Sequence, residues 1–396
     1  MDTQHPPDPT PPAEYIARAR ALVPLLAAAA PRIEQARELP PEVLDALHEA
    51  GLFRLLLPRS VGGAELQPAP YAEAIEAIAM GDASTAWCLG QNSGCSMSAA
   101  YLEPEVARQV FGEPRAVLAW GAGAVGKAHA VDGGYRVSGT WQFASGSRHA
   151  TWLGGHCTIT EPDGSQRRAA DGSPAERTML FPRARATISD VWHVSGLKGT
   201  GSDSYSVADL FVEDAYSLDR CNPAERREPG RLYRLESMQL YASAFAGVAM
   251  GAARAALDAF VELARNKRPR GSAAALRDNA VVQSEVGLAE ARLRSARTFL
   301  LQTLRETWDA LAAGGEITLE QRMQIRLAST YAIQEAREVV DTAYHAAGAT
   351  AIFQSGPFER RFRDVHAVCQ QVQGRRSHFE TVGQHMLGLK PDLMFV

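Results

Sequence analysis

The chain has 396 residues, more than one hydrophobic core usually holds, so we expect two or three packed units. A hydrophobic content of 46% with 22% charged residues is ordinary for a soluble globular protein. The net charge of −4, without a long block of one sign, argues against nucleic acid or an anionic membrane as partner. The five cysteines form no CxxC pair, which argues against a disulfide framework and a zinc site.

The first twelve residues, MDTQHPPDPTPP, include five prolines and predict a disordered arm over residues 1–12. This acidic, proline-rich start is unlike a signal or transit peptide. No apolar run reaches the roughly 20 residues that a membrane-spanning helix needs. We therefore expect a cytoplasmic protein.

Residues 13–115 are predicted to form an N-terminal helical domain. Apolar residues from Ala13 onward have helical spacing, and we expect Pro31 to end this first helix. Further helical stretches, closed by glycine or rich in small apolar residues, cover 41–50, 71–80 and 84–102.

The composition changes at Ala116, where short strand-like runs alternate with Gly, Pro, Asp and Ser. These runs predict an antiparallel β middle domain over residues 116–220, and they lie at 117–120, 134–137, 151–153, 178–181 and 207–212.

Residues 231–396 are predicted to form a C-terminal helical bundle domain. An Ala- and Gly-rich helix over 238–264 is followed by an apolar stripe from Val282 to Leu304. The sequence Thr318-Leu-Glu-Gln321 is a capping box that starts the next helix, and a last helix begins near Phe358.

The stretch from Val137 to Trp152, VSGTWQFASGSRHATW, has the composition of a ligand contact. Alternation predicts a strand, a turn at Gly139 and a second strand with Trp141 and Phe143 on one side. Small residues follow at Ser145-Gly-Ser147, so a flat heterocycle could lie close to the backbone. The alternative is a plain β-hairpin with core aromatics and turn serines.

Three motifs in order carry a resemblance to a known family: VSGTWQFASG from Val137, WHVSGLKGTGSDSYSVADLFV from Trp192, and FERRFRDVHAV from Phe358, followed by HFETVGQHMLGL. They resemble the acyl-CoA dehydrogenase-fold superfamily, and more closely its branch of flavin-dependent, two-component monooxygenases. The resemblance implies a mainly α fold with a central β domain: an N-terminal helical domain, an antiparallel β middle domain and a C-terminal four-helix bundle. It also implies a homotetramer.

The activity implied by the resemblance is that of a reduced-flavin-dependent monooxygenase. Reduced FAD or FMN, made by a separate flavin reductase, would react with molecular oxygen to give C4a-hydroperoxyflavin. One oxygen would pass to an aromatic or heteroatom-bearing small molecule. An acyl thioester dehydrogenase is the alternative, and a catalytically silent scaffold with this fold is a third hypothesis.

The same resemblance assigns candidate site residues. It places the Ser145 hydroxyl near flavin N5, where a turn serine bonded to the backbone is the structural alternative. It assigns cofactor contacts to Trp120, Gly121, Phe143, Ala144, Ser145 and Arg268. Arg268 belongs to a basic cluster at a helix end, and the family often supplies such an arginine from a neighbouring subunit. Substrate contacts are expected at Trp87, Asn92, Cys95 and His366.

At the positions of a catalytic base, the chain departs from the family pattern. The two family positions for a dehydrogenase glutamate fall at Ser355 and Val372, and neither is acidic. The monooxygenase branch often has a histidine eight residues after an Arg-Asp pair, which here is Gln371. Glutamine cannot take a proton near neutral pH. Gln371 would therefore line the reacting face and orient a ligand, or His366 or His378 would act as the base.

A GxGxxG pattern at Gly121–Gly126 is not a dinucleotide site, because a hairpin and not a long helix follows it. His149 and His156 lack metal-ligand spacing and are expected to be structural.

Overall fold

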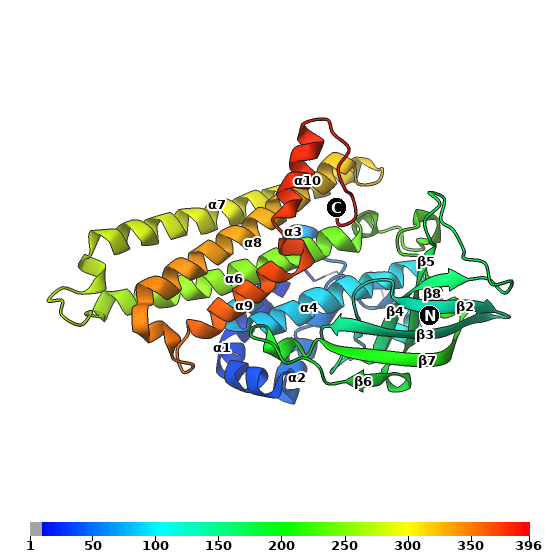
Figure 1. Cartoon of the computed structure of the whole chain (residues 1–396), viewed down its shortest axis with the longest axis horizontal. Helices are drawn as coiled ribbons and strands as arrows, with labels where there is room; N and C mark the ends of the chain where they lie inside the picture. The colour runs from blue at the N-terminus through cyan, green and yellow to red at the C-terminus, as the bar shows by residue number, and fades with distance from the viewer. Residues whose placement is uncertain (1–9) are drawn as a thin grey trace, which may run out of the picture.

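A computed structural model of the chain describes residues 10–396. The predicted arm over 1–12 falls mostly on residues 1–9, outside the described part. Helices and sheet occupy opposite ends of the molecule, with long helices side by side at one end and the strands at the other (Figure 1).

The N-terminal helices are α1 Pro12–Ala36, α2 Pro41–Glu49, α3 Pro68–Gly81, α4 Ala83–Ser96 and α5 Pro104–Phe111. Four of these five begin with proline, whose fixed φ and missing N–H suit the first helical turn. The exception, α4, is capped by the buried Asp82, whose Oδ1 accepts the Thr85 N–H at 2.7 Å.

The predicted end of the first helix at Pro31 is wrong, because α1 continues through Pro24 and Pro31 to Ala36. Each internal proline removes one backbone hydrogen bond. Burial of Leu26 beside Gly81 of α3, and of Ile33 beside Gly199, offsets that loss.

The middle of the chain forms eight strands: β1 Leu118–Trp120, β2 Gly126–Val131, β3 Gly134–Ala144, β4 Trp152–Thr160, β5 Glu176–Pro182, β6 Thr187–Ser189, β7 Asp203–Glu213 and β8 Ser217–Leu218. Their order is β6-β7-β3-β2-β4-β5-β8, with β1 also paired to β4. Both β1 and β2 run parallel to β4, along successive parts of one edge, so the sheet is mixed and not wholly antiparallel. The hairpin expected after Gly126 is confirmed, since β2 pairs antiparallel with β3. Strand patterns in a sequence do not specify which other strands pair, and β6 and β8 were not predicted.

The strand β3 corrects two expectations. It passes through Gly139 without a turn, with register shifts between Val137 and Gly139 and between Trp141 and Ala144. Trp141 is 0% exposed, whereas Phe143 is 61% exposed and has a φ of +60°. The two aromatic side chains therefore do not share one side, because the second irregularity and the positive φ rotate Phe143 outward.

The C-terminal helices are α6 Ser237–Asn266, α7 Ala280–Ala310, α8 Leu319–Ala347, α9 Glu359–Gln370 and α10 Ser377–Met386. The capping box that starts α8 is confirmed, since Gln321 N donates to Thr318 Oγ1 at 3.2 Å and Thr318 N to Gln321 Oε1 at 2.9 Å. The chain does not end with the helix at Phe358, because a short turn after α9 leads into α10.

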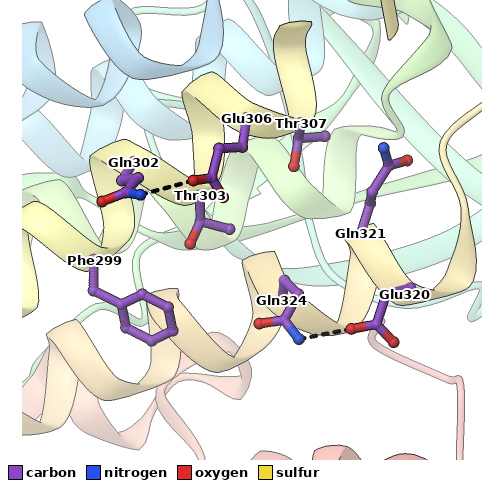
Figure 2. A pocket seen from close by; sticks show the side chains of 8 residues that line it. All are labelled: Phe299, Gln302, Thr303, Glu306, Thr307, Glu320, Gln321 and Gln324. Atoms are coloured by element: carbon purple, nitrogen blue, oxygen red, sulfur yellow. Dashed lines mark hydrogen bonds between the residues drawn. The ribbon is translucent and has the colours of Figure 1, made fainter. Parts of the chain in front are cut away.

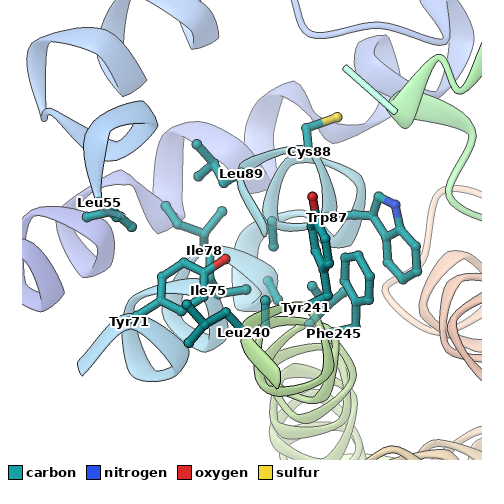
Figure 3. Close-up of a cluster of buried hydrophobic side chains, with 14 of the residues drawn as sticks. Leu55, Tyr71, Ile75, Ile78, Trp87, Cys88, Leu89, Leu240, Tyr241 and Phe245 are labelled. Atoms are coloured by element: carbon teal, nitrogen blue, oxygen red, sulfur yellow. The ribbon is translucent and has the colours of Figure 1, made fainter. Parts of the chain in front are cut away.

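The helix α6 is the core of the molecule and packs on α3, α4 and α8. By length and composition it could cross a membrane, but 72% of its most apolar window is buried inside the protein, as in a core helix of a globular fold. Tyr241 and Phe245 of α6 meet Trp87 of α4 in this core (Figure 3).

The indole of Trp141 fills the interior of the sheet domain and donates Nε1–H to the carbonyl of His156 at 3.0 Å. Gly155 leaves room for it, because a Cβ at that position would lie 2.5 Å from the Trp141 ring. By contrast, a Cβ at Gly287 of α7 would meet nothing within 4 Å.

We predict that Gly155→Ala lowers the free energy of unfolding by about 1–3 kcal/mol, because a buried indole cannot move aside in a packed core. Gly287→Ala is the matched control and should stabilise by up to about 1 kcal/mol through higher helix propensity. Denaturant unfolding at one protein concentration measures both. Equal stabilities of the two variants would contradict this packing.

Candidate active site

The structure brings three separate segments together at the edge of the sheet domain. The N–H of Ala122 donates to the carbonyl of Gln142 at 2.9 Å, which places residues 121–125 beside the end of β3. The ring of Trp192 meets that of Phe143 edge to face, with centroids 6.1 Å apart. The GxGxxG segment and the first two family motifs thus share one surface.

Ser145 lies at the centre of this convergence and is buried. Its Oγ accepts the indole N–H of Trp87 from α4 at 3.0 Å and lies 2.6 Å from Ser202 Oγ. Ser202 Oγ in turn lies 2.7 Å from Thr200 Oγ1. A row of three buried hydroxyls therefore runs from β3 into the loop before β7.

The loop that carries Trp192 is held by the buried carboxylate of Asp203. Its Oδ1 accepts the N–H groups of Val191 and Trp192, both at 3.2 Å. Its Oδ2 accepts Nε of Arg148 at 2.7 Å, and Arg148 comes from the turn after Ser145. This charged hydrogen bonding fixes Trp192 relative to Phe143.

Leu197 is the second strained residue of the site, with a φ of +53°. Its N–H donates to Oδ1 of Asp364 on α9 at 2.7 Å, and its carbonyl accepts from Trp192 Nε1 at 3.1 Å and Thr200 Oγ1 at 2.9 Å. Left-handed backbone at residues other than glycine concentrates at functional sites. The surrounding bonds hold this one in place.

Asp364 is buried with only partial compensation of its charge. Burial raises the pKa of its carboxyl to about 7; the Leu197 N–H lowers this pKa, while nearby Asp82 raises it. Both carboxyls lie where α4, the 197–200 loop and α9 meet.

The remaining cofactor candidates differ in accessibility. The Trp120 side chain is buried, edge-on to His156 at 5.0 Å and under the guanidinium of Arg220 at 5.3 Å. Gly121 N–H donates to Tyr205 Oη at 3.1 Å, and Ala144 is fully buried. Direct contact with the planar ring of a cofactor is therefore easiest for Phe143 and for the exposed residues that follow Gly121.

The substrate candidates on α4 surround Ser145 from the helical side. Trp87 stacks on Phe245 with centroids 3.8 Å apart. Cys95 Sγ lies 3.5 Å from Tyr241 Oη, and burial raises the pKa of this thiol to about 12, so it stays protonated. These contacts form an apolar aromatic wall behind the hydroxyl.

Asn92 is a buried amide with both ends engaged. Its Nδ2 donates to the carbonyl of Leu118 at 3.1 Å, and its Oδ1 lies 3.1 Å from Nε2 of His149. Burial lowers the pKa of His149 to about 3, so the imidazole is neutral and Nε2–H is the donor. Gly146, with a φ of +77°, leaves the room these groups need, since a Cβ there would lie 2.6 Å from Asn92 Oδ1.

The candidates on and after α9 are His366, Gln371 and His378, and their hydrogen-bond partners do not include the three hydroxyls of the row. His366 Nε2 is 2.9 Å from Asp341 Oδ1, so this imidazole faces α8. Gln371 caps the turn after α9 by accepting the Gln373 N–H at 2.7 Å. His378 is buried, which lowers its pKa, and its Nε2 lies 2.7 Å from the Val372 carbonyl.

Arg268 is an exposed residue of the loop between α6 and α7. This loop lies at the opposite end of the molecule from the sheet (Figure 1). Arg265 pairs with Glu262, and Lys267 donates to the Ala347 carbonyl at the end of α8. Among residues 10–396, Arg268 and Arg270 have no ion pair or side-chain hydrogen bond. Arg268 cannot reach Ser145 within one chain.

An open cavity of about 450 Å³ lies between α7 and α8 (Figure 2). Its amide and carboxylate side chains already bond one another, as in the pairs Gln302–Glu306 and Gln324–Glu320, both at 2.7 Å. None of its lining residues belongs to the segments that converge at Ser145, so it is not the candidate site.

The converging residues fit a flavin. Phe143 and Trp192 offer apolar ring surface, and Ala122 and Gly123 expose backbone with almost no side chain. The Ser145 hydroxyl follows Phe143 by two residues, at the end of β3. The arrangement suits a flat heterocycle with a polar edge.

Comparison with known proteins identifies the fold. Residues 18–109 match the family described as acyl-CoA dehydrogenase, N-terminal domain, and residues 243–374 match the acyl-CoA dehydrogenase, C-terminal domain. The chain therefore has the acyl-CoA dehydrogenase fold, which confirms the predicted fold class.

Within that fold, named relatives identify the branch. The chain is 31% identical to indole-3-acetate monooxygenase of Pseudomonas putida over 90% of both chains. It is 30% identical to the oxygenase component of the FADH(2)-dependent resorcinol hydroxylase of Rhizobium sp., over 98% of both. The HsaA monooxygenase structure from Mycobacterium tuberculosis aligns with a TM-score of 0.87 at 28% identity, over 98% of this chain and 100% of that one. The chain belongs to the flavin-dependent monooxygenases, which use reduced flavin and molecular oxygen.

Sequence reasoning missed four residues that organise the site: Thr200, Ser202, Asp203 and Asp364. All four lie inside motifs that the sequence analysis quoted, GTGSDS and RFRD. For Thr200, Ser202 and Asp203 the signal was a run of hydroxyls and an acid at the start of a strand. Asp364 is the acid of the Arg-Asp pair on α9. The bonding partner of Asp364 is 167 residues away in the chain.

We predict that Asp364→Asn removes a pH-dependent loss of stability. A carboxyl whose folded pKa is about 7, against an ordinary value of 3.8, stabilises the fold at low pH and loses that contribution as the pH rises to 7. The wild type should therefore lose on the order of 4 kcal/mol relative to the variant between about pH 4 and pH 7. The asparagine Oδ1 still accepts the Leu197 N–H.

Urea unfolding across that pH range measures the difference, with the exposed Asp45→Asn as control. A constant difference between wild type and Asp364→Asn at every pH would show that Asp364 keeps an ordinary pKa.

Proposed function

We propose that this monooxygenase inserts one oxygen atom into an aromatic small molecule, with reduced FAD or FMN supplied by a separate reductase. The names of two relatives support the substrate class, because indole-3-acetate and resorcinol are both aromatic. The wall of Trp87, Tyr241 and Phe245 beside Ser145 supports it too, since aromatic rings pack well on such surfaces.

One observation carries the assignment of the site: the buried hydroxyl of Ser145 accepts the indole N–H of Trp87 from the helical side and lies two residues after the exposed ring of Phe143. Bound reduced flavin supplies the electrons that activate oxygen. The chain has to bind the ring, orient its edge and exclude water. Phe143 and Trp192 would bind it, the backbone from Trp120 to Gly123 would line it, and Ser145 would meet N5.

Thioester dehydrogenation is a poorer fit to this chain. It requires a carboxylate to remove an α-proton. The residues at both family positions, Ser355 and Val372, are not acidic. In the described part of the chain, the side chains bonded to Ser145 are an indole and a hydroxyl, and neither can act as this base. The silent scaffold is disfavoured by the retained convergence around Ser145.

Gln371 is proposed to orient a ligand and not to exchange a proton. Its amide oxygen accepts the Gln373 N–H, which leaves the amide NH₂ as a donor. The rings of His366 and His378 are engaged with Asp341 and with the Val372 carbonyl, respectively. A base from these two remains the alternative assignment.

Arg268 is proposed to bind the flavin phosphate of a neighbouring subunit in a homotetramer. Its loop lies far from Ser145 in its own chain, and a guanidinium suits a phosphate. Exposed apolar side chains on the C-terminal helices and tail support burial against other subunits, and they include Val281, Leu288, Ile352, Phe353, Met386, Leu387, Leu389 and Met394.

We predict that Ser145→Ala uncouples oxygen use from substrate oxygenation. Loss of one hydrogen bond of about 1 kcal/mol to the flavin edge should raise hydrogen peroxide release per flavin oxidised by about fivefold. Anaerobic titration with reduced FMN and FAD, followed by mixing with oxygen, measures binding and peroxide together. Ser147→Ala is the control. Ser147 lies two residues after Ser145, and its buried hydroxyl has no hydrogen-bond partner among the described residues.

The proposed function would be overturned if the wild type bound no reduced flavin, or held oxidised FAD that acyl thioesters bleach anaerobically. Peroxide release equal to wild type in Ser145→Ala would remove only the role of Ser145.

We predict that Arg268→Ala weakens reduced-flavin binding by about tenfold, the size of one charge-assisted hydrogen bond. Arg270→Ala, two residues away and equally exposed, should leave the affinity unchanged. Mixed oligomers of Arg268→Ala and Ser145→Ala chains should regain sites in which both residues are intact. If mixing gave no gain in coupled activity, Arg268 of one subunit and Ser145 of its neighbour would not serve the same flavin site.

A further inference from the structure

The hydroxyl row behind Ser145 has a single hydrogen-bond direction. Each hydroxyl owns one hydrogen, and the Leu197 carbonyl at the far end can only accept. Thr200 Oγ1 donates to that carbonyl at 2.9 Å, so Thr200 must accept from Ser202 at 2.7 Å. Ser202 must then accept from Ser145 at 2.6 Å. All three bonds form together only in this order.

The direction determines what Ser145 can offer to a ligand. Its hydrogen is committed to Ser202, and one of its two acceptor positions is taken by the Trp87 indole N–H at 3.0 Å. One acceptor position remains, and no donor. Thr200 and Ser202 are both 2% exposed, so bulk water does not readily supply an alternative partner.

We propose that Thr200 and Ser202 are positioning residues that make the site select reduced over oxidised flavin. The inference rests on the proposed function, in which flavin N5 meets Ser145. N5 carries a hydrogen in reduced flavin and can donate it to the free acceptor position. N5 of oxidised flavin has a lone pair and no hydrogen, so it meets the lone pair of Ser145.

This selection suits an oxygenase served by a separate reductase. Spent oxidised flavin is bound less tightly than the reduced flavin that must replace it. The discrimination comes from the direction of a neutral hydrogen-bonded row, so it requires no charged residue at N5.

The variant Thr200→Val tests the inference, because valine has nearly the same shape and no hydroxyl. Ser202 then loses its acceptor and can turn to donate to Ser145, which frees the Ser145 hydrogen to point at the ligand. Oxidised flavin gains a hydrogen bond and reduced flavin loses one. The ratio of the Kd for oxidised flavin to the Kd for reduced flavin should fall by about three- to tenfold.

Anaerobic titrations with reduced and oxidised FMN and FAD measure this ratio without turnover. Thr200→Ser keeps the hydroxyl and should keep the wild-type ratio, as should Ser147→Ala. Ser202→Ala is a second variant, which removes the acceptor for Ser145 directly and should lower the ratio as Thr200→Val does.

The inference would be overturned if Thr200→Val and Ser202→Ala kept the wild-type ratio of the two Kd values. Both Kd values would then be unchanged or raised by the same factor, which would show a purely structural role. A wild type that binds neither form would overturn the proposed function and this inference with it. A lowered ratio in both variants, with Thr200→Ser like the wild type, supports it.

Discussion

The site depends on one leucine in a left-handed backbone conformation. Leu197 gives its N–H to Asp364 of the helical bundle, and its carbonyl accepts from Trp192 and Thr200. A relaxed backbone there would turn the carbonyl away from both donors. The exposed ring surface and the hydroxyl row would then lose their common anchor. The buried carboxyl of Asp364, with its raised pKa, holds the bundle against this loop through its bond to the Leu197 N–H.

Local signals in the sequence were sufficient for most helices. The capping box at Thr318 and the prolines that open α2 and α3 act within one turn, so their effect is readable without tertiary structure. Pro31 shows the limit of such signals. It is a helix breaker locally, yet α1 continues past it because its buried side packs on α3, a contact that proline statistics do not contain.

The site was predictable as a motif but not as a geometry. The resemblance selected Ser145 and Phe143, but alternation placed Phe143 on the same side as Trp141, since neither the bulge nor the positive φ has a signature in the sequence. The partners of Ser145 are 57 and 58 residues away in the chain, on different elements. Only the fold brings an indole from α4 and a serine before β7 to one oxygen.

The end of the hydroxyl row distinguishes orientation from proton transfer. A row that conducted protons would end on a group able to hold one, such as a carboxylate or an imidazole. This one ends on the Leu197 carbonyl, and the nearby carboxyl of Asp364 bonds the N–H of the same residue and not the row. Ser145 can therefore be oriented but not deprotonated through its neighbours. A fixed acceptor that removes no proton suits a reduced flavin, whose N5 hydrogen has to stay in place. It does not suit thioester dehydrogenation, which begins when a base removes the α-proton of the substrate.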